Sequence, residues 1–491
     1  MDRSRAPGDG ENTRRTRREV LKTGLRAAGV VFGTPWILAH RASGAGRNPP
    51  LEAGQAVVDT TPPKGVGLAG FHYRPGKERR VDGVRQATEA RALVLRQGPT
   101  QTAIVSVDLC AFGADVAERI QRAVERRTGI PAQNVHLCAT HTHSMPAFCY
   151  LRQWGEYPQA YAADVERKIV QAVARAKADA APCAIFVGKA VASAASFNRT
   201  TPKFRTEDQF GPDATDADRW LDRTLHTLRF ERAGGKPDLL WYHFSAHPVC
   251  YADRLAGPDW PGLVIEMARS DGVPHPCYLQ GHAGDVNPGP GKPWRGDARE
   301  TAGSVYAAIK KALAAERRIE SPTLAAVSRP MDLPLDLKLY RQWLETYRRE
   351  PEKCSRGVWV DAGFARDWYQ ANSRKPWTRP NLPIRLAALR LGPVGLVFHP
   401  SELYSFYGLV IQRDSPLPET IVVGYADGLV GYLPDPRAYQ AGEYAAIVVP
   451  KILDYPPFQP TAAQAMSAGI GNMLHKVASL GRMESEHDSE R

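Results

Sequence analysis

The chain has 491 residues, of which 43% are hydrophobic and 24% charged, a composition typical of a folded globular protein rather than a disordered one. Its formal charge is +12, but residues 1–45 hold nine Arg or Lys against four Asp or Glu, which leaves +7 spread along the remainder. No basic block or aromatic–basic array indicates a nucleic-acid surface, so nucleic-acid binding is not expected.

Residues 1–45 are predicted to be an export signal. Arg17 and Arg18, in the run TRREVLK at 16–22, precede a mildly apolar stretch at 23–39, and this pattern resembles a twin-arginine signal peptide. A stable transmembrane anchor is disfavoured, because the stretch is shorter than the ~20 apolar residues of a spanning helix and contains Gly, Pro and Arg. A disordered basic tail is the alternative. The signal predicts the twin-arginine export machinery as a partner, and a periplasmic or extracellular location.

Beyond the leader, β-branched runs alternate with helical patterns. In chain order, strands are predicted at 91–96, 102–109, 135–139, 184–191, 227–231, 239–245, 278–280, 386–391, 395–398 and 420–425. Helices are predicted at 113–127, 263–269, 298–315, 339–349 and 463–480. The alternation predicts an α/β fold, with one large domain over 46–480 in which mixed β-sheets are flanked by helices, and a polar tail at 481–491.

The segment 330–383 is rich in Trp, Arg and Pro and is predicted to be an elaboration between strands. It contains Trp343, Trp359, Trp368 and Trp377. These side chains either overhang a functional site or pack a peripheral helical subdomain, since large aromatic side chains are usually at least partly buried. The sequence leaves both interpretations open.

Seven cysteines are too few for a disulfide scaffold, and none forms a Cys-x-x-Cys pair for a thiolate metal site. Most are expected to be buried thiols. One or two bridges could form outside the cytoplasm, and an odd count leaves at least one cysteine unpaired.

His141 and His143 follow the predicted strand at 135–139. Side chains two residues apart in an extended chain point to the same side, roughly 6–7 Å apart, so both imidazoles can face one cavity. Imidazole is a common metal ligand, but histidines also serve as hydrogen-bonded core residues. The flanking residues bear on which interpretation holds.

The run NVHLCATHTHSMP at 134–146 resembles the neutral, non-lysosomal ceramidases in their catalytic domain. Further blocks agree in order: VDTTPP at 58–63 with LAGF at 68–71, FNR at 197–199, SAHP at 245–248, GDVNP at 284–288, PSE at 400–402, and Tyr432, Tyr439 and Tyr444. The resemblance covers residues from about 55 to 478. It implies a ceramidase-like catalytic domain over 46–480, without the immunoglobulin-like C-terminal domain of that family.

The resemblance implies one zinc ion bound by His141, His247, Glu402 and Tyr432. Neutral imidazoles and a carboxylate suit this borderline-soft cation, and an open coordination position lets a bound water molecule reach a pKa near 7. A phenol has an ordinary pKa of about 10, so Tyr432 needs the field of the cation to bind as a phenolate.

Three further residues are implied at the reacting group. His143 is then free to orient the scissile carbonyl or to move a proton, which suits a side chain that titrates near neutrality. Arg199 and Tyr444 match family positions that contact the reacting group, where they would stabilise an oxyanion. The alternatives are a surface ion pair for Arg199 and a packed ring for Tyr444.

Asp285 lies in a Gly-Asp turn after the predicted strand at 278–280. It is a candidate catalytic residue that supports a zinc-bound histidine, and the alternative is an Asx-turn that closes the loop. His282 and His399 are further polar candidates without an assigned role, and each could equally stabilise a loop.

The resemblance breaks at Gly281 and His282, where ceramidases typically read Ser-Asn ahead of the Gly-Asp turn. No hydroxyl is available there, so the expected mechanism is attack by zinc-bound hydroxide alone. The sequence thus predicts a zinc-dependent hydrolase of N-acyl amides acting on a small amphipathic, ceramide-like substrate. The alternatives are a zinc hydrolase acting on another ester or on a glycan or cell-wall amide, and a non-catalytic binding protein on the same fold.

Overall fold

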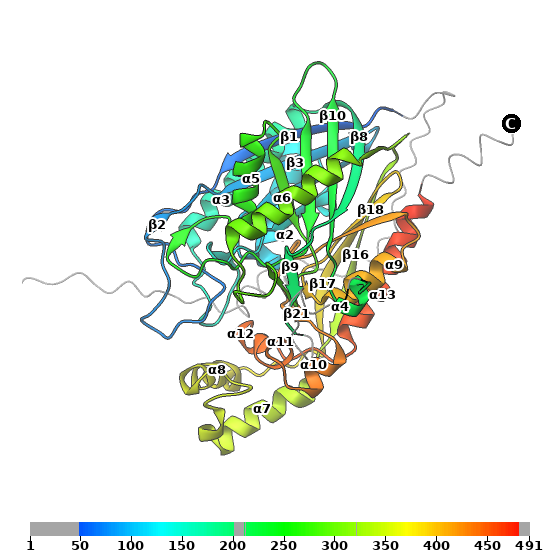
Figure 1. Cartoon of the computed structure of the whole chain (residues 1–491). Coiled ribbons are helices and arrows are strands. Elements are labelled where there is room, and N and C mark those ends of the chain that lie inside the picture. Colours follow the sequence, from blue (N-terminus) through cyan, green and yellow to red (C-terminus); the bar gives the residue numbers. More distant parts are fainter. Residues whose placement is uncertain (1–48, 201–210, 212, 321, 481–491) are drawn as a thin grey trace, which may run out of the picture. The chain divides into compact units, whose positions relative to one another are not determined.

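The computed structural model describes residues 49–200, 211, 213–320 and 322–480 (Figure 1). The predicted export signal and the polar tail lie outside the described residues. No helix in the described part is long and apolar enough to cross a membrane.

The larger of two main sheets has nine strands and mixed pairing. Its strand order is β13-β11-β10-β8-β1-β3-β4-β6, and β15 pairs with β8 beside this path. The strands are β1 (Glu52–Asp59), β3 (Glu89–Gln97), β4 (Thr100–Val107), β6 (Val135–Ala139), β8 (Ala181–Val191), β10 (Thr224–Arg232), β11 (Leu239–Phe244), β13 (Pro276–Gln280) and β15 (Arg317–Arg318). The central pairs are antiparallel, whereas β4 with β6 and β11 with β13 are parallel. The two edge strands, β6 and β13, are each followed by a loop that carries predicted site residues.

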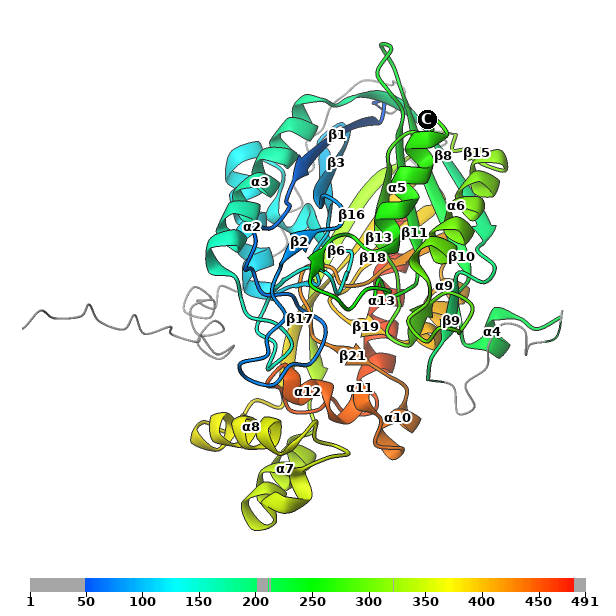
Figure 2. The ribbon, with the colours of Figure 1, turned by 60° about the vertical axis from the view of Figure 1, so that its left-hand side comes forward.

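Four helices flank the nine-stranded sheet. They are α2 (Ala114–Thr128), α3 (Gln159–Ala178), α5 (Trp260–Ser270) and α6 (Ala298–Ala314). Helix α3 contacts β1 and β3 and packs against α2, whereas α6 contacts β8 and β10 and packs against α5 (Figure 2). Val116, Ile120 and Val124 recur every four residues in α2 and are buried, and the helix ends at Gly129 in the left-handed conformation.

A second sheet of four strands lies against the first. Its order is β16 (Leu324–Pro334), β17 (Asn381–Leu391), β18 (Val394–Phe398) and β20 (Glu419–Val423), antiparallel except for the parallel pair β18 and β20. One hydrophobic core joins the sheets, with Ile104 and Trp241 from the first and Leu389 and Phe398 from the second. Helices α9 (Ser405–Arg413) and α13 (Ala462–Ser479) pack on the smaller sheet.

The Trp-rich segment forms a helical insertion between β16 and β17. It contains α7 (Leu337–Arg349), the 3₁₀ helix η3 (Pro351–Cys354) and α8 (Ala362–Arg374), which lie together in both views (Figures 1 and 2). Trp368 contacts Trp343 and Trp359, with ring centroids 6.3 and 5.1 Å apart. The buried ammonium of Lys451 lies 3.4 Å from the Trp343 centroid. These contacts favour the interpretation that the Trp side chains pack a helical subdomain. The helices lie between Pro334 at the end of β16 and Asn381 at the start of β17, so residues 330 and 383 themselves belong to these strands.

Short paired strands bring distant loops together near the ends of the sheets. These pairs are β2 (Gly83–Val84) with β12 (Leu255–Ala256), β5 (Ala111–Phe112) with β7 (Ala147–Phe148), β9 (Ser196–Asn198) with β14 (Val286–Pro288), and β19 (Glu402–Leu403) with β21 (Tyr432–Leu433). The remaining elements are η1 (Ala132–Asn134), α4 (Asp216–Arg219), α10 (Pro436–Gln440), α11 (Tyr444–Ile447) and α12 (Val449–Ile452).

The predicted α/β fold with mixed sheets and flanking helices is confirmed. Five long elements were missed, namely β1, α3, α8, α9 and β16. Helix α3 buries Ala162, Ala172 and Ala176 among larger residues, and this alanine-rich face gives little apolar contrast with its other side. None of the seven cysteines, all of which the structure describes, forms a disulfide.

Candidate metal centre

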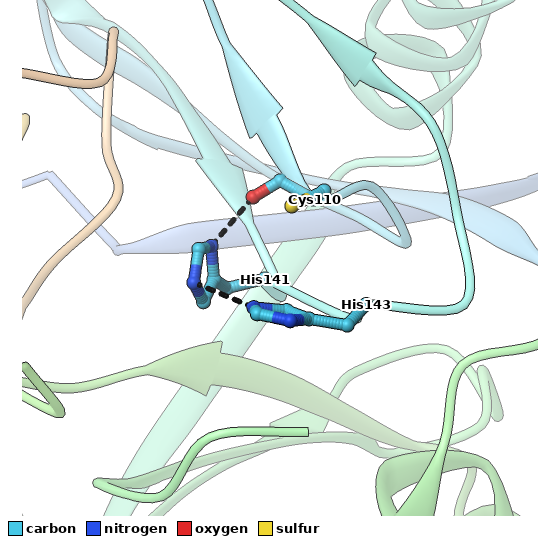
Figure 3. A group of neighbouring side chains, drawn as sticks. All are labelled: Cys110, His141 and His143. Carbon is cyan, nitrogen blue, oxygen red and sulfur yellow. Dashed lines mark hydrogen bonds between the residues drawn. The ribbon is translucent and has the colours of Figure 1, made fainter. Parts of the chain in front are cut away.

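His141 occupies the loop that follows β6 and has a strained backbone. Its φ of 64° is unusual for a non-glycine residue, and such strain is kept where the surroundings fix it. Its Nδ1 donates to the carbonyl oxygen of Cys110 at 2.7 Å (Figure 3). The aromatic ring of Tyr425 packs on the imidazole with centroids 4.2 Å apart. These contacts leave Nε2 as the nitrogen that can bind a metal ion.

His247 lies in the loop after β11 and is held in the same way. Its Nδ1 donates to the carbonyl oxygen of Val286 at 2.9 Å, and its backbone N–H bonds to that same oxygen. Val286 belongs to β14, which β9 holds in place. A backbone carbonyl that accepts from one ring nitrogen fixes the tautomer and directs the other nitrogen toward a metal.

Glu402 completes a buried group of three ligands. Its Oε2 lies 3.4 Å from Nε2 of His141 and 3.4 Å from Nε2 of His247. Ligand atoms about 2.0–2.1 Å from a tetrahedral ion lie roughly 3.3 Å apart, so both distances fit one bound cation. Within the described ranges, neither Nε2 of His247 nor Oε2 of Glu402 has a partner of good hydrogen-bond geometry. The three side chains therefore fit a divalent metal ion such as zinc.

The ionisation of these ligands also suits a cation. Burial lowers the pKa of His247 to about 4, so its imidazole is neutral near pH 7. Burial alone would raise the pKa of the Glu402 carboxyl, but His141 and His247 overcome this and lower it far below its usual value. Two ligands are thus in the unprotonated forms that metal binding requires.

Tyr432 lies opposite Glu402, because β19 and β21 pair in parallel and place the two residues in register. Its hydroxyl oxygen accepts a hydrogen bond of 2.8 Å from Nη2 of Arg199. Burial raises the pKa of the Tyr432 phenol well above 10, so a bound cation is needed to make it a phenolate ligand.

Arg199 lies inside this group of residues. Its Nη1 donates to Oδ1 of Asn287 at 2.9 Å, and Nη2 also donates to the carbonyl oxygen of Gly284 at 2.9 Å. The alternative of a surface ion pair is wrong, because none of these partners is a carboxylate. They are the side-chain oxygen of Asn287, the backbone oxygen of Gly284 and the phenol of Tyr432. Its predicted contact with a reacting group stays a prediction.

His143 lies next to His141, with their Nε2 atoms 3.2 Å apart. Phe71 packs edge-on against His143 with centroids 5.0 Å apart, and Gly70 touches the same ring. Gly70 has a φ of +91°, and a Cβ there would lie 2.3 Å from Cγ of His143, so only glycine permits this approach. Burial and the neighbouring histidines hold the pKa of His143 well below its usual value.

Tyr444 and Asp285 differ in how close they lie to the ligands. Tyr444 begins α11, is 45% exposed, and has its ring 6.3 Å from that of Tyr432.

The Asp285 carboxylate accepts hydrogen bonds from the side chain of Asn198 at 2.6 Å and from the backbone N–H and hydroxyl of Ser405 at 2.7 and 2.9 Å. In the described part of the chain, the carbonyl of Val286 rather than Asp285 supports His247. The predicted support of a ligand by Asp285 itself is therefore corrected, because its carboxylate already joins β9 to the start of α9.

The residues that depart from the ceramidase pattern form a tightly packed region. A Cβ on Gly281 would lie 2.1 Å from Oγ of Ser245 and 2.7 Å from Nε2 of His243, so no side chain fits there. His282 is buried with Nε2 3.2 Å from Asp222. His399 bonds to the Ser401 hydroxyl at 2.9 Å. His282 and His399 thus have local structural partners.

Sequence reasoning missed Cys110, Tyr425 and Asn287 as parts of the site. The Cys110 and Val286 carbonyls carry no side-chain signal in the sequence. Tyr425 ends a predicted strand, and aromatic residues at strand ends are too common to mark a site.

Comparisons with known proteins bear on the family resemblance and on the fold. Residues 52–256 match the family model described as neutral/alkaline non-lysosomal ceramidase, N-terminal. The neutral ceramidase structure from Pseudomonas aeruginosa has a TM-score of 0.66 at 20% identity, covering 87% of this chain and 74% of that one. A ceramidase complexed with C2 has a TM-score of 0.66 at 19% identity, covering 89% and 76%. No curated protein sequence matches the chain. These findings confirm the resemblance to the neutral ceramidases, through the family model over the first part and through the fold over most of the chain. Glu402 and Tyr432 lie outside the segment that the family model matches.

Proposed function

We propose that the chain is a zinc-dependent hydrolase of N-acyl amides, with a ceramide-like lipid as the leading substrate class. The observation that carries this proposal is the buried group of His141, His247 and Glu402 on a ceramidase fold. The distances between their ligand atoms suit one tetrahedral cation, and His247 and Glu402 are ready to bind it at neutral pH.

A zinc ion at this site would lower the pKa of a water molecule and polarise an acyl carbonyl. Tyr432 is the proposed fourth ligand, and Nη2 of Arg199 donates to its oxygen at 2.8 Å. The guanidinium charge stabilises both negative groups around the centre, the Glu402 carboxylate and the phenol oxygen.

His143 and Tyr444 are proposed to act on the substrate. His143 is neutral near pH 7, so its imidazole can accept a hydrogen bond as water attacks the amide, whereas its lowered pKa disfavours holding a proton. Tyr444 is partly exposed beside Tyr432, where its hydroxyl can donate to the oxyanion. Water is the proposed nucleophile, because the packing around Gly281 leaves no room for a serine side chain.

The direct test is fatty-acid release from N-acyl sphingoid bases by the purified, zinc-loaded protein. Glu402→Gln should remove activity together with the metal, since the amide lacks the ligand charge. Tyr404→Phe is the matched control, because Tyr404 is buried nearby without belonging to the ligand group. A parallel screen of esters and of glycan or cell-wall amides separates the lipid substrate from other acyl substrates. A protein that binds zinc but turns over none of these substrates would reject the hydrolase proposal.

Export by the twin-arginine machinery is also proposed, on the evidence of Arg17 and Arg18 before the apolar stretch. Replacing both by Lys should retain the precursor in the cytoplasm, whereas Arg26→Lys, in the apolar stretch, should not. Equal export of both variants would contradict the twin-arginine route.

A further inference from the structure

A second group of potential metal ligands overlaps the first. Cys110, His141 and His143 each offer a ligand atom, and these atoms lie within 4.8 Å of one another. Figure 3 shows that the three residues come from two loops, with the His143 ring and the Cys110 carbonyl oxygen on either ring nitrogen of His141. Cys110 lies just before β5, and the side chains of Cys110 and His141 are buried.

Both groups depend on one atom, Nε2 of His141. The other ring nitrogen is committed to the Cys110 carbonyl at 2.7 Å. Nε2 lies 3.4 Å from the Glu402 carboxylate and 3.2 Å from Nε2 of His143. Each separation is close to the roughly 3.3 Å between two ligands of a tetrahedral ion. A cation on Nε2 can therefore take Glu402 with His247, or it can take His143, whose group also holds the Cys110 thiol within 4.8 Å.

The two ligand sets differ in chemical softness. Glu402 with two imidazoles offers oxygen and nitrogen, which suit zinc, whereas Cys110 adds a thiolate, which favours softer cations. Within the described residues, Nδ1 of His143 has no hydrogen-bond partner, so this nitrogen is not held by a competing bond.

We propose that a soft divalent cation such as Cd²⁺ binds His141, His143 and Cys110 and thereby displaces zinc from the first group. Binding converts the Cys110 thiol to a thiolate, with one proton released to solvent for each cation bound. Because His141 cannot serve two ions through one nitrogen, one equivalent of the soft cation releases one equivalent of zinc. The consequence for activity rests on the proposed function, since His143 is then withdrawn from the substrate.

X-ray absorption at the cadmium edge tests the proposal without any activity measurement. The zinc-loaded protein receives one equivalent of Cd²⁺, and zinc release is followed with a colorimetric chelator. We expect one sulfur neighbour around cadmium and close to one zinc released. The Cys110→Ser protein should show no sulfur neighbour and should need at least about tenfold more Cd²⁺ to release zinc.

Two controls keep the assignment specific. Cys183 and Cys250 are the partly exposed cysteines, and the Cys183→Ser, Cys250→Ser double variant should retain the sulfur neighbour. If Cys110→Ser does not fold, the comparison of the wild-type protein with this double variant still decides whether a buried thiol binds. Cadmium surrounded by nitrogen and oxygen alone, or a sulfur neighbour that persists in folded Cys110→Ser protein, would overturn the proposal. If zinc is displaced as predicted and no substrate is hydrolysed, the proposed function fails while this inference stands.

Discussion

Replacing Gly281 by Ser restores the hydroxyl that ceramidases typically have in this position, and we predict that it destabilises the protein without adding activity. The new Cβ would lie 2.1 Å from Oγ of Ser245 and 2.7 Å from Nε2 of His243, far inside van der Waals contact. His243 cannot move away freely, because its Nε2 bonds to the carbonyl of Val422 at 2.9 Å. Overpacking of a buried site typically costs about 1–3 kcal/mol, and loss of one hydrogen bond about 1 kcal/mol. We therefore expect a loss of about 2–3 kcal/mol.

Urea unfolding, followed by far-ultraviolet circular dichroism, measures this loss from the midpoint at constant slope. The same measurement on Gly281→Ala separates the Cβ clash from the hydroxyl, and it should lose most of the same stability. Ser245→Gly removes the nearest clashing atom, so combining it with Gly281→Ala should recover about 1 kcal/mol as a coupling energy. A Gly281→Ser protein within about 0.5 kcal/mol of wild type, or one that hydrolyses amides faster, would refute the packing argument.

Three other predictions address the centre. Glu402→Gln should lower the zinc content of purified protein from one equivalent to near zero, measured by elemental analysis, and an unchanged zinc content would exclude Glu402 as a ligand. The Tyr432→Phe protein should still contain zinc, but its zinc affinity should fall about 10–100-fold in a chelator competition. The zinc affinity of Tyr404→Phe should equal that of the wild type, and an unchanged affinity in Tyr432→Phe would mean that the phenol does not bind. Burial lowers the pKa of His243 to about 3 from about 6.5 when unfolded, so the unfolded chain gains a proton first and stability falls as pH decreases below 6.5. His243→Gln should remove about 3 kcal/mol of the stability difference between pH 7 and 4.5, and the same pH dependence in both proteins would contradict this cause.

Elements with strong periodicity were predictable from the sequence. The strand at 135–139 follows from a fully buried apolar run, and the helix before it follows from Val116, Ile120 and Val124 on one helical face. Helix α3 was missed because small alanines form much of its buried face. Strand β16 was missed because it contains two prolines and exposed arginine among few β-branched residues.

The site was predictable only in part. His141 and His143 follow a predicted strand, but that His247 and Glu402 meet them depends on two sheets and a parallel pair of short strands that no local pattern encodes. Their identification from sequence therefore required the resemblance to a known family. The backbone carbonyls that orient the two histidines belong to residues 31 and 39 positions away in the chain, so their role is a product of tertiary structure.

The packing at Gly281 changes how the departure from the family pattern is understood. In the sequence, this glycine stands where ceramidases typically have a serine, so it reads as the loss of a hydroxyl. In the structure, Ser245 and His243 fill the space that a side chain would need. The neighbouring residues are thus adapted to glycine, and a single reversion cannot restore what the pattern lacks.

The most direct test of the account is a crystal structure of the zinc-loaded protein with anomalous data collected on both sides of the zinc absorption edge. We predict one anomalous peak within about 2.0–2.2 Å of Nε2 of His141, Nε2 of His247 and Oε2 of Glu402. An anomalous peak elsewhere, or none in protein shown to contain one equivalent of zinc, would contradict the proposed metal centre.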